Sequence, residues 1–187
     1  MKKLLITLSI IIVSQLAIAQ KTESGVTMSE TIKSGNTTLT LNGIGIREKL
    51  WIDLYVAGLY LETKTKDANT VINGNKNMLL KLNIVSGLIS SEKMSNAVEE
   101  GFETATDGKT ESLRTRIDLF KAIFLKDEIK KGVVFDIYYI PGKGTVVYTD
   151  SKLQATIKGL DFKKALFAIW LGEDPADDDL KEDLLGE

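Results

Sequence analysis

The sequence predicts an α+β fold in which one antiparallel sheet is covered by helices that come in separate blocks of the chain. Apolar residues alternate with period two within residues 26–46 and 78–85, as in strands with a buried face. They then recur at helical spacing between residues 91 and 124, before strand-like segments return over residues 133–157. This order lacks the strict strand–helix alternation of a doubly wound parallel sheet.

The composition indicates one globular domain and excludes several classes of site. Of 187 residues, 43% are hydrophobic and 27% charged, so the chain can bury a sizeable core. It contains no His and no Cys, which excludes a Ser-His-Asp triad, a thiol nucleophile, a disulfide and a zinc site with imidazole or thiolate ligands. With 24 basic and 26 acidic residues, it lacks the basic excess that binding to nucleic acid requires.

The N-terminal segment has the three-part layout of a secretory signal peptide. Two lysines precede an almost entirely apolar run over residues 4–13, and Ala17-Ile18-Ala19 supplies the small-x-small pattern of a cleavage site. The run is shorter than the roughly 20 residues of a spanning helix, so an uncleaved anchor is the weaker alternative. We predict that residues 1–19 are removed and that residues 20–187 form a single exported domain, periplasmic or secreted, without a stable membrane span.

The strand segments predict two local features of the sheet. The apolar phase changes between residues 39–41 and 44–46, so we expect a bulge or a sharp bend near Gly43. Residues 51–62 are apolar at both parities, which predicts a strand covered on both faces near the centre of the sheet. Later strands are expected at three places: residues 133–140, 145–149 and 153–157.

Helical spacing and capping signals predict four helices. Ser90 is a plausible cap for the first, Asp161 for the third, and Gly172 ends the third. Residues 63–77 are polar and rich in turn signals, which predicts a connection without a helix. The four helices are expected over these ranges: 91–105, 113–124, 162–171 and 177–185.

Two motifs suggest ligand sites that their spacing does not support. Gly43-Ile44-Gly45 resembles the start of a dinucleotide-binding loop, but Glu48 stands where the third glycine is needed. The acidic residues within 173–183 lack the spacing and the turn glycine of an EF-hand, and acids at the start of a helix are stabilised by its dipole. We interpret the glycines as part of a bent strand, and we predict no metal and no cofactor.

Arg47 is the candidate binding residue, and Tyr55 is its candidate partner. Arg47 ends an apolar stretch, and Tyr55 follows within the most hydrophobic strand segment. A guanidinium presents a planar fork to a carboxylate and a Tyr hydroxyl can add a donor, so together they could hold an acidic head group in an apolar cavity. The alternative is an internal ion pair between Arg47 and Asp53 or Glu62, and spacing alone favours that alternative.

Two stretches of the chain resemble the chalcone isomerase-like superfamily. GIGIR at residues 43–47, followed by LYVAGLYLE at residues 54–62, is similar to the family's opening strands. ALFAIWLGEDP at residues 165–175, together with residues 180–186, looks like the ending of its bacterial exported branch. The resemblance implies an open-faced β-sandwich, in which helices are layered over one face of a large antiparallel sheet with a cleft between them.

The resemblance also implies roles for single residues. Arg47 matches an arginine that faces the flavonoid in plant isomerases and holds the carboxylate in fatty-acid-binding relatives. Tyr55 matches a Thr that positions a water in the isomerases and a Tyr that grips the carboxylate in the fatty-acid binders. Ser90 stands where the isomerases carry a catalytic Tyr, and Ala97, beside Asn96, falls where they carry an Asn. These departures weaken the prediction of ring closure.

We therefore predict a non-catalytic exported protein that binds a fatty acid or a similar apolar carboxylate, with Arg47 as anion anchor and Tyr55 as its hydrogen-bond partner. One alternative is an isomerase, an intramolecular lyase acting on a chalcone-like or other small unsaturated compound. Another is a structural module whose cleft is filled by its own side chains. The sequence predicts no oligomeric state. Apolar residues of the helices are expected to line the cleft: Met94, Val98, Phe102 and Phe120.

Overall fold

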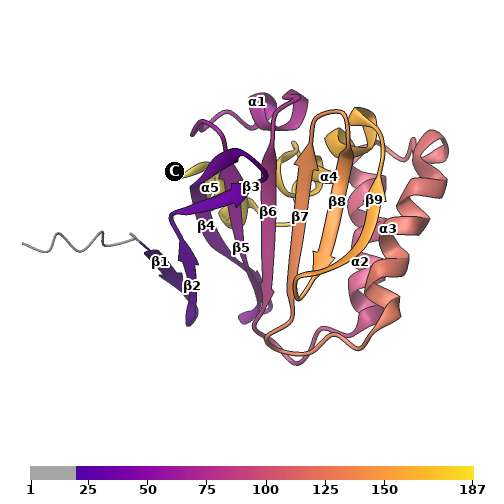
Figure 1. The fold of residues 1–187 in the computed structure, drawn as a ribbon. Helices are drawn as coiled ribbons and strands as arrows, with labels where there is room; N and C mark the ends of the chain where they lie inside the picture. Colours follow the sequence, from indigo (N-terminus) through magenta and orange to yellow (C-terminus); the bar gives the residue numbers. More distant parts are fainter. Residues whose placement is uncertain (1–19) are drawn as a thin grey trace, which may run out of the picture.

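The structure, a computed structural model, describes residues 20–187 and has one large sheet as its main layer (Figure 1). Seven strands pair antiparallel in the order β3-β4-β5-β6-β7-β8-β9, and a two-stranded hairpin, β1-β2, lies beside them. The signal peptide predicted over residues 1–19 lies outside the described residues. The strands are β1 (Gln20–Glu23), β2 (Val26–Ser29), β3 (Thr31–Ser34), β4 (Thr37–Lys49), β5 (Ile52–Leu61), β6 (Met78–Ile84), β7 (Val134–Ile140), β8 (Gly144–Thr149) and β9 (Lys152–Ile157).

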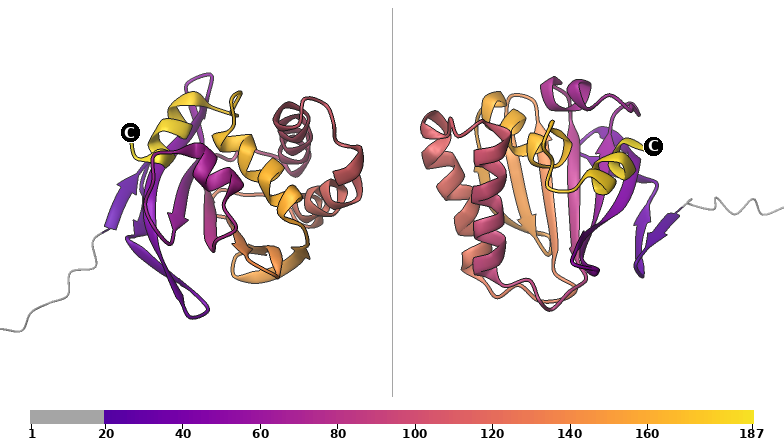
Figure 2. Two further views of the ribbon diagram at one scale, coloured as in Figure 1. Left: turned by 90° about the horizontal axis from the view of Figure 1, so that it is seen from above. Right: turned by 180° about the vertical axis from the view of Figure 1, so that it is seen from behind.

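Helices cover one face of this sheet, which confirms the predicted α+β fold with helices layered on one side. The helices are α1 (Ala68–Asn73), α2 (Ser91–Ala105), α3 (Arg114–Lys126), α4 (Leu160–Leu171) and α5 (Asp178–Leu185), with a 3-10 turn at Glu111–Leu113. Seen from behind, α2 and α3 lie over the β8–β9 side of the sheet and α5 lies over β4 (Figure 2). Within residues 20–187, no helix is both long and apolar enough to cross a membrane.

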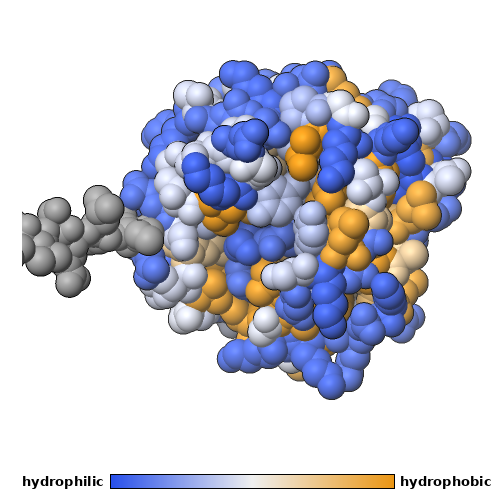
Figure 3. Space-filling model, viewed as in Figure 1, coloured by the Kyte–Doolittle hydropathy of each residue, from blue (hydrophilic) through white to orange (hydrophobic). Residues whose placement is uncertain are grey.

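The sheet buries apolar side chains on both of its faces. The larger core lies between sheet and helices and includes Phe102, Phe120 and Phe162, all fully buried. A smaller cluster on the opposite face includes Met28 of β2, which packs on Gly58 of β5. Strand β5 is therefore covered on both sides, as its apolar residues at both parities predict. Figure 3 looks onto this second face, where hydrophilic and apolar residues are interspersed.

The predicted irregularity in β4 is present, and the C-terminal helix packs directly against it. The register of β4 against β5 shifts between Leu41 and Gly43. A Cβ atom at Gly43 would overlap the backbone oxygen of Asp183 in α5, so only glycine permits this close approach. Asn42, at the bulge, donates from its buried side-chain amide to the Leu184 carbonyl at 2.8 Å. The glycines thus serve the packing of α5 and the bend of the strand, not a phosphate loop.

Three local predictions are wrong. Trp51 does not begin β5 but lies in the turn before it, with 89% of its surface exposed, because a two-residue turn joins β4 and β5. The region predicted to be a connection, residues 63–77, contains helix α1. The N-cap of α4 is Gly159 and not Asp161, whose carboxylate instead forms an ion pair with Arg116 at 2.6 Å.

The apolar pattern of the sequence does not indicate helix α1, because the helix is short and buries only Val71. The Asp67 side chain caps its first turn by accepting from backbone amides. At its other end, the buried amine of Lys163 in α4 donates to the carbonyls of Ile72 and Gly74, each at 2.9 Å. Burial lowers the pKa of Lys163 to about 8. The two helices are therefore joined through a buried lysine.

We expect Gly43→Ala to destabilise the protein by about 1–3 kcal/mol, because the added methyl group would force α5 away from β4. The measurement is the free energy of unfolding in urea, followed by circular dichroism. Gly87→Ala is the matched control, since a Cβ atom there meets nothing within 4 Å and its unfolding free energy should change by less than about 0.5 kcal/mol. Equal stability of the two variants would show that α5 does not depend on this close contact.

Candidate functional site

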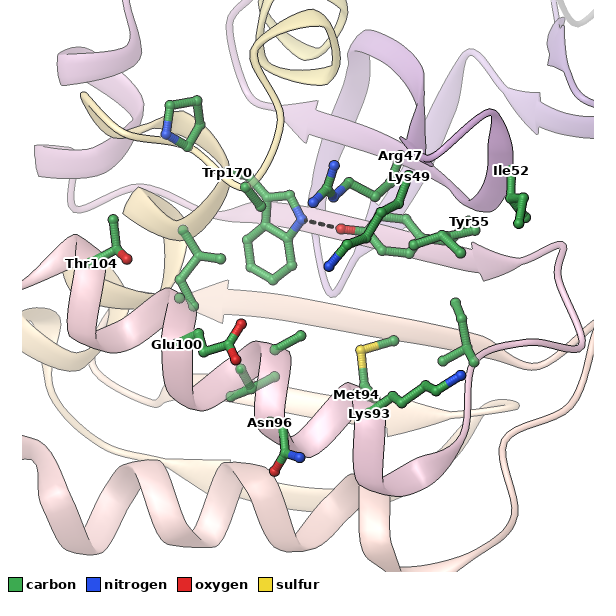
Figure 4. Close-up of a pocket in the computed structure, with 18 of the residues that line it drawn as sticks. Arg47, Lys49, Ile52, Tyr55, Lys93, Met94, Asn96, Glu100, Thr104 and Trp170 are labelled. Carbon is green, nitrogen blue, oxygen red and sulfur yellow. Dashed lines mark hydrogen bonds between the residues drawn. The ribbon is translucent and has the colours of Figure 1, made fainter.

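A cavity of about 650 Å³ lies between the β4–β5 part of the sheet and the helices (Figure 4). Its walls come from the two strands, from α2, from the end of α4 and from residues 174–176, which lead from α4 to α5. The volume falls within the range of roughly 300–1,000 Å³ that is usual for small-molecule sites. Apolar side chains supply most of the lining, among them Leu54, Met94, Val98 and Ile169.

The structure brings Arg47 and Tyr55 together in this cavity. They are direct partners in the register of β4 against β5, so their side chains lie on the same face, towards α2 and α4. A register irregularity between Arg47 and Glu48 adjoins the pair. Both residues line the cavity, and Figure 4 shows them side by side next to Trp170. Their predicted role in binding a ligand remains a prediction.

Arg47 has an internal partner, but it is neither of the two acids that spacing suggests. Its Nη1 donates to the Asp177 carboxylate at 2.7 Å and to the Glu48 carbonyl at 2.8 Å. Asp53 instead accepts a hydrogen bond from a serine near β1, and Glu62 accepts from Asn77. The remaining guanidinium donors, on Nε and Nη2, have no hydrogen-bond partner among residues 20–187, so one edge of the fork is available to a ligand.

Asp177 is held in place by the start of α5. Its Oδ1 accepts from the Leu180 amide at 2.9 Å and caps the helix, while its Oδ2 reaches Arg47. The pair is largely shielded, with 20% of the Arg47 side chain and 14% of the Asp177 side chain exposed. The sequence signal for this acid was its position as a helix cap, but nothing local indicated that it would face Arg47.

Tyr55 is buried, and its hydroxyl is oriented by a tryptophan that sequence reasoning missed. The indole Nε1 of Trp170 donates to the Tyr55 oxygen at 2.9 Å. A buried indole needs an acceptor, and this requirement was the only clue to the contact. Burial raises the pKa of Tyr55 to about 12, so the hydroxyl stays protonated at neutral pH. Because the oxygen accepts from Trp170, the hydroxyl hydrogen can be donated to a ligand.

Two of the four apolar residues that were expected to line the cavity do so. Met94 and Val98 line the cavity. Phe102 and Phe120 do not, because both rings pack against Phe162 in the core, with centroid distances of 5.4 Å and 6.1 Å. Met94 and Val98 thus face the cavity, whereas Phe102, on the same helix, faces the core.

The residues at the positions of the isomerase catalytic groups make other contacts in this structure. Ser90 caps α2, and its hydroxyl oxygen accepts from the Lys93 amide at 3.2 Å. Asn96 borders the cavity, but its side chain extends away from Tyr55 (Figure 4). Among residues 20–187, no three acidic side chains come together as a possible metal site.

Comparison with known proteins identifies the fold family. A sequence profile described as "Chalcone isomerase-like" matches residues 20–186. The chain belongs to the chalcone isomerase-like family. This confirms the resemblance carried by its opening strands and its ending, and the open-faced β-sandwich that the resemblance implies. A search of curated proteins found no match.

A solved structure with a similar fold is that of a fatty-acid binding protein from Arabidopsis thaliana. The TM-score is 0.71 with 18% sequence identity, and the match covers 89% of this chain and 96% of the other. At this identity the likeness establishes the chalcone isomerase-like fold alone.

Tyr55 should make stability depend on pH in the alkaline range. Its pKa is higher in the folded state than the ordinary value near 10, so its contribution is complete below pH 10 and is lost between pH 10 and 12. Between pH 8 and pH 11, the free energy of unfolding should therefore fall by about 1.4 kcal/mol more for the native protein than for Tyr55→Phe. Urea unfolding at both pH values measures this, and parallel losses in the two proteins would contradict it.

Proposed function

We propose that this protein binds a fatty acid or a similar apolar carboxylate in the cavity and leaves it chemically unchanged. The proposal rests on one observation above all, the meeting of Arg47 and Tyr55 on the wall of a largely apolar cavity. Two neighbouring donors on the wall of a largely apolar cavity match a ligand with one anionic end and a hydrocarbon body.

The carboxylate would bind at the edge of Arg47 that Asp177 leaves open. The ligand oxygens accept from Nε and Nη2 of Arg47 and from the Tyr55 hydroxyl, which Trp170 holds in orientation. The hydrocarbon chain then lies along Met94 and other apolar residues of α2 and α4. Burial of that chain supplies most of the affinity, at roughly 25 cal/mol per Å² of apolar surface removed from water, while the polar contacts fix its direction.

Three further observations support binding without turnover, outside the cytoplasm. The solved structure with a similar fold is described as a fatty-acid binding protein, which supports the ligand class. The positions of the isomerase Tyr and Asn hold Ser90 and Ala97, so two of the groups that would stabilise a reacting phenolate differ. The signal-peptide pattern of residues 1–19 supports export to a periplasm or beyond.

Removing the guanidinium should weaken fatty-acid binding strongly. We expect Arg47→Met to lower the affinity about 30-fold, which corresponds to about 2 kcal/mol for a charge-assisted contact in a shielded site. Isothermal titration calorimetry with palmitate measures the change. Arg116→Met is the matched control, because Arg116 pairs with Asp161 and lies outside the cavity. With 1-hexadecanol, the uncharged alcohol that corresponds to palmitate, the native protein and Arg47→Met should have similar affinities. An equal loss of affinity for both ligands would argue against an anion anchor.

Neutralising the internal partner should have the opposite effect. Asp177 neutralises Arg47 and would repel a ligand carboxylate, so Asp177→Asn should raise palmitate affinity about fivefold. An Asn side chain still caps α5, and the loss of the ion pair should cost about 1 kcal/mol in unfolding free energy. Asp178→Asn, in the first turn of α5, is the control for a general change of charge. A weaker affinity for Asp177→Asn would mean that Asp177 serves to orient the guanidinium.

The first experiment is native mass spectrometry with lipid extraction on the protein purified from the exported fraction of its producing cells. A stoichiometric fatty acid that is absent from Arg47→Met would support the binding function and identify the cargo. An empty protein, together with turnover of a chalcone panel that Tyr55→Phe abolishes, would favour the isomerase alternative. Recovery of the full-length chain from the cytoplasm alone would contradict export.

A further inference from the structure

The end of the cavity that holds Arg47 and Tyr55 also holds a second cation, Lys49. Lys49 follows Arg47 by two residues in β4, and the extra residue at the nearby irregularity, Leu54, belongs to β5, so the alternation of side chains along β4 is kept. The side chains of Arg47 and Lys49 therefore lie on the same face of the sheet. Both line the cavity, and Figure 4 shows the Lys49 amine pointing into it beside Tyr55. We call Arg47, Lys49 and Tyr55 the cationic end of the cavity.

The acids nearest to Lys49 in β4 and β5 face away from the cavity. Glu48 and Asp53 are direct partners in the register, and alternation along β4 places them on the face opposite to Lys49. On that face, the Asp53 carboxylate accepts from the hydroxyl of Ser24, in the turn of the β1–β2 hairpin, at 2.6 Å. Among residues 20–187, the Lys49 amine forms no ion pair. Its charge is therefore left for a ligand.

The balance of charges gives Lys49 a part that Arg47 does not have. The Asp177 carboxylate lies 2.7 Å from Nη1 of Arg47, so this pair contributes no net charge. Two further acids line the cavity, Glu100 and Asp174, but within the described chain neither forms an ion pair with Arg47 or Lys49. Figure 4 shows Glu100 further along α2, away from the cationic end. Lys49 thus supplies the uncompensated positive charge at this end.

The donors of the cationic end match the acceptors of one carboxylate. The open edge of Arg47 offers Nε and Nη2, Tyr55 offers its hydroxyl hydrogen, and Lys49 offers its ammonium group. An ionised carboxylate has about four acceptor positions on its two oxygens. One carboxylate can therefore accept from all three side chains, whereas a neutral head group would leave the charge of Lys49 unbalanced.

We propose that Lys49 is a second anchor for the anionic group of the ligand and makes the cavity selective for apolar ligands that carry one negative charge. This inference rests on the proposed function, in which the same cavity binds an apolar carboxylate. Arg47 and Tyr55 orient the head group, and Lys49 supplies the net charge that attracts it. Lys49 is exposed, whereas only 20% of the Arg47 side chain is exposed, so salt should weaken the contribution of Lys49 more strongly.

The test uses two fluorescent probes that differ by one charge. One is 8-anilino-1-naphthalenesulfonate, an apolar anion, and the other is N-phenyl-1-naphthylamine, which has the same ring system without the sulfonate. We expect Lys49→Met to lower the affinity for the anionic probe about fivefold at low ionic strength, the upper range for an exposed charge. In about 0.5 M salt this loss should shrink to less than about twofold. The affinity for the uncharged probe should change by less than about twofold in either condition.

Lys93→Met is the matched control, because it removes the same charge from another residue that lines the cavity. The Lys93 amine donates to the Leu88 carbonyl at 3.1 Å, and Figure 4 shows its side chain on the α2 side, apart from the Tyr55 hydroxyl. This variant should lose less than about twofold in affinity for the anionic probe. Arg47→Met tests the position of the probe, and it should lower the affinity for the anionic probe as it does for palmitate.

Three results would overturn the proposal. The first is equal affinity of Lys49→Met and the native protein for the anionic probe, and the second is an equal loss in Lys49→Met and Lys93→Met, which would indicate a general effect of charge. The third is an equal loss for the two probes in Lys49→Met, which would indicate lost packing instead of lost charge. A native protein that binds neither probe would also overturn it.

The second anchor and the fatty-acid ligand can fail separately, and calorimetry with palmitate distinguishes them. We expect Lys49→Met to lower palmitate affinity about fivefold as well. A protein that binds the anionic probe through Lys49 but binds no palmitate would retain the second anchor and contradict the fatty-acid proposal. A protein whose palmitate affinity is the same with and without Lys49→Met would retain the fatty-acid proposal and contradict the second anchor.

Discussion

The packing of α5 against β4 is the contact on which the cavity depends. Gly43 allows the helix to approach the strand, and Asn42 fixes its C-terminal end through the Leu184 carbonyl. Because α5 is held there, its cap Asp177 reaches Arg47, and the segment that leads into it becomes a wall of the cavity. The bulge in β4, the ion pair and the shape of the site thus form one arrangement.

The polar part of the cavity is organised by neighbours that come from the C-terminal half of the chain. Asp177 balances the charge of Arg47, so the guanidinium can remain in a shielded position without a ligand. Trp170 occupies the acceptor side of the Tyr55 hydroxyl, which leaves its hydrogen to point elsewhere. Preorganisation of this kind reduces the cost of ordering side chains when a ligand binds. Strands β4 and β5 provide the hydrogen-bond donors Arg47 and Tyr55, and residues of α4 and the start of α5 orient their side chains.

Much of the fold could be predicted from residue patterns, whereas the contacts of the site could not. Apolar residues at both parities indicated β5, and a change in the phase of the period-two pattern indicated the irregularity near Gly43, because alternate residues of a strand lie on opposite faces of the sheet. Helical spacing placed α2 but could not tell that Met94 faces a cavity and Phe102 the core, since both environments are apolar. Asp177 lies 130 residues from Arg47, and no local pattern encodes such a distance.

That long separation has a consequence for the kinetics of folding. The contacts between Arg47 and Asp177 and between Asn42 and Leu184 close loops of 130 and 142 residues, among the largest that a chain of this length can form. Contacts with such separations carry a high entropic cost and slow the folding reaction. During synthesis from the N-terminus, the wall of the cavity can be added only when almost the whole chain is present. The part of the cavity wall that leads into α5 is therefore synthesised after every strand of the sheet that supports it.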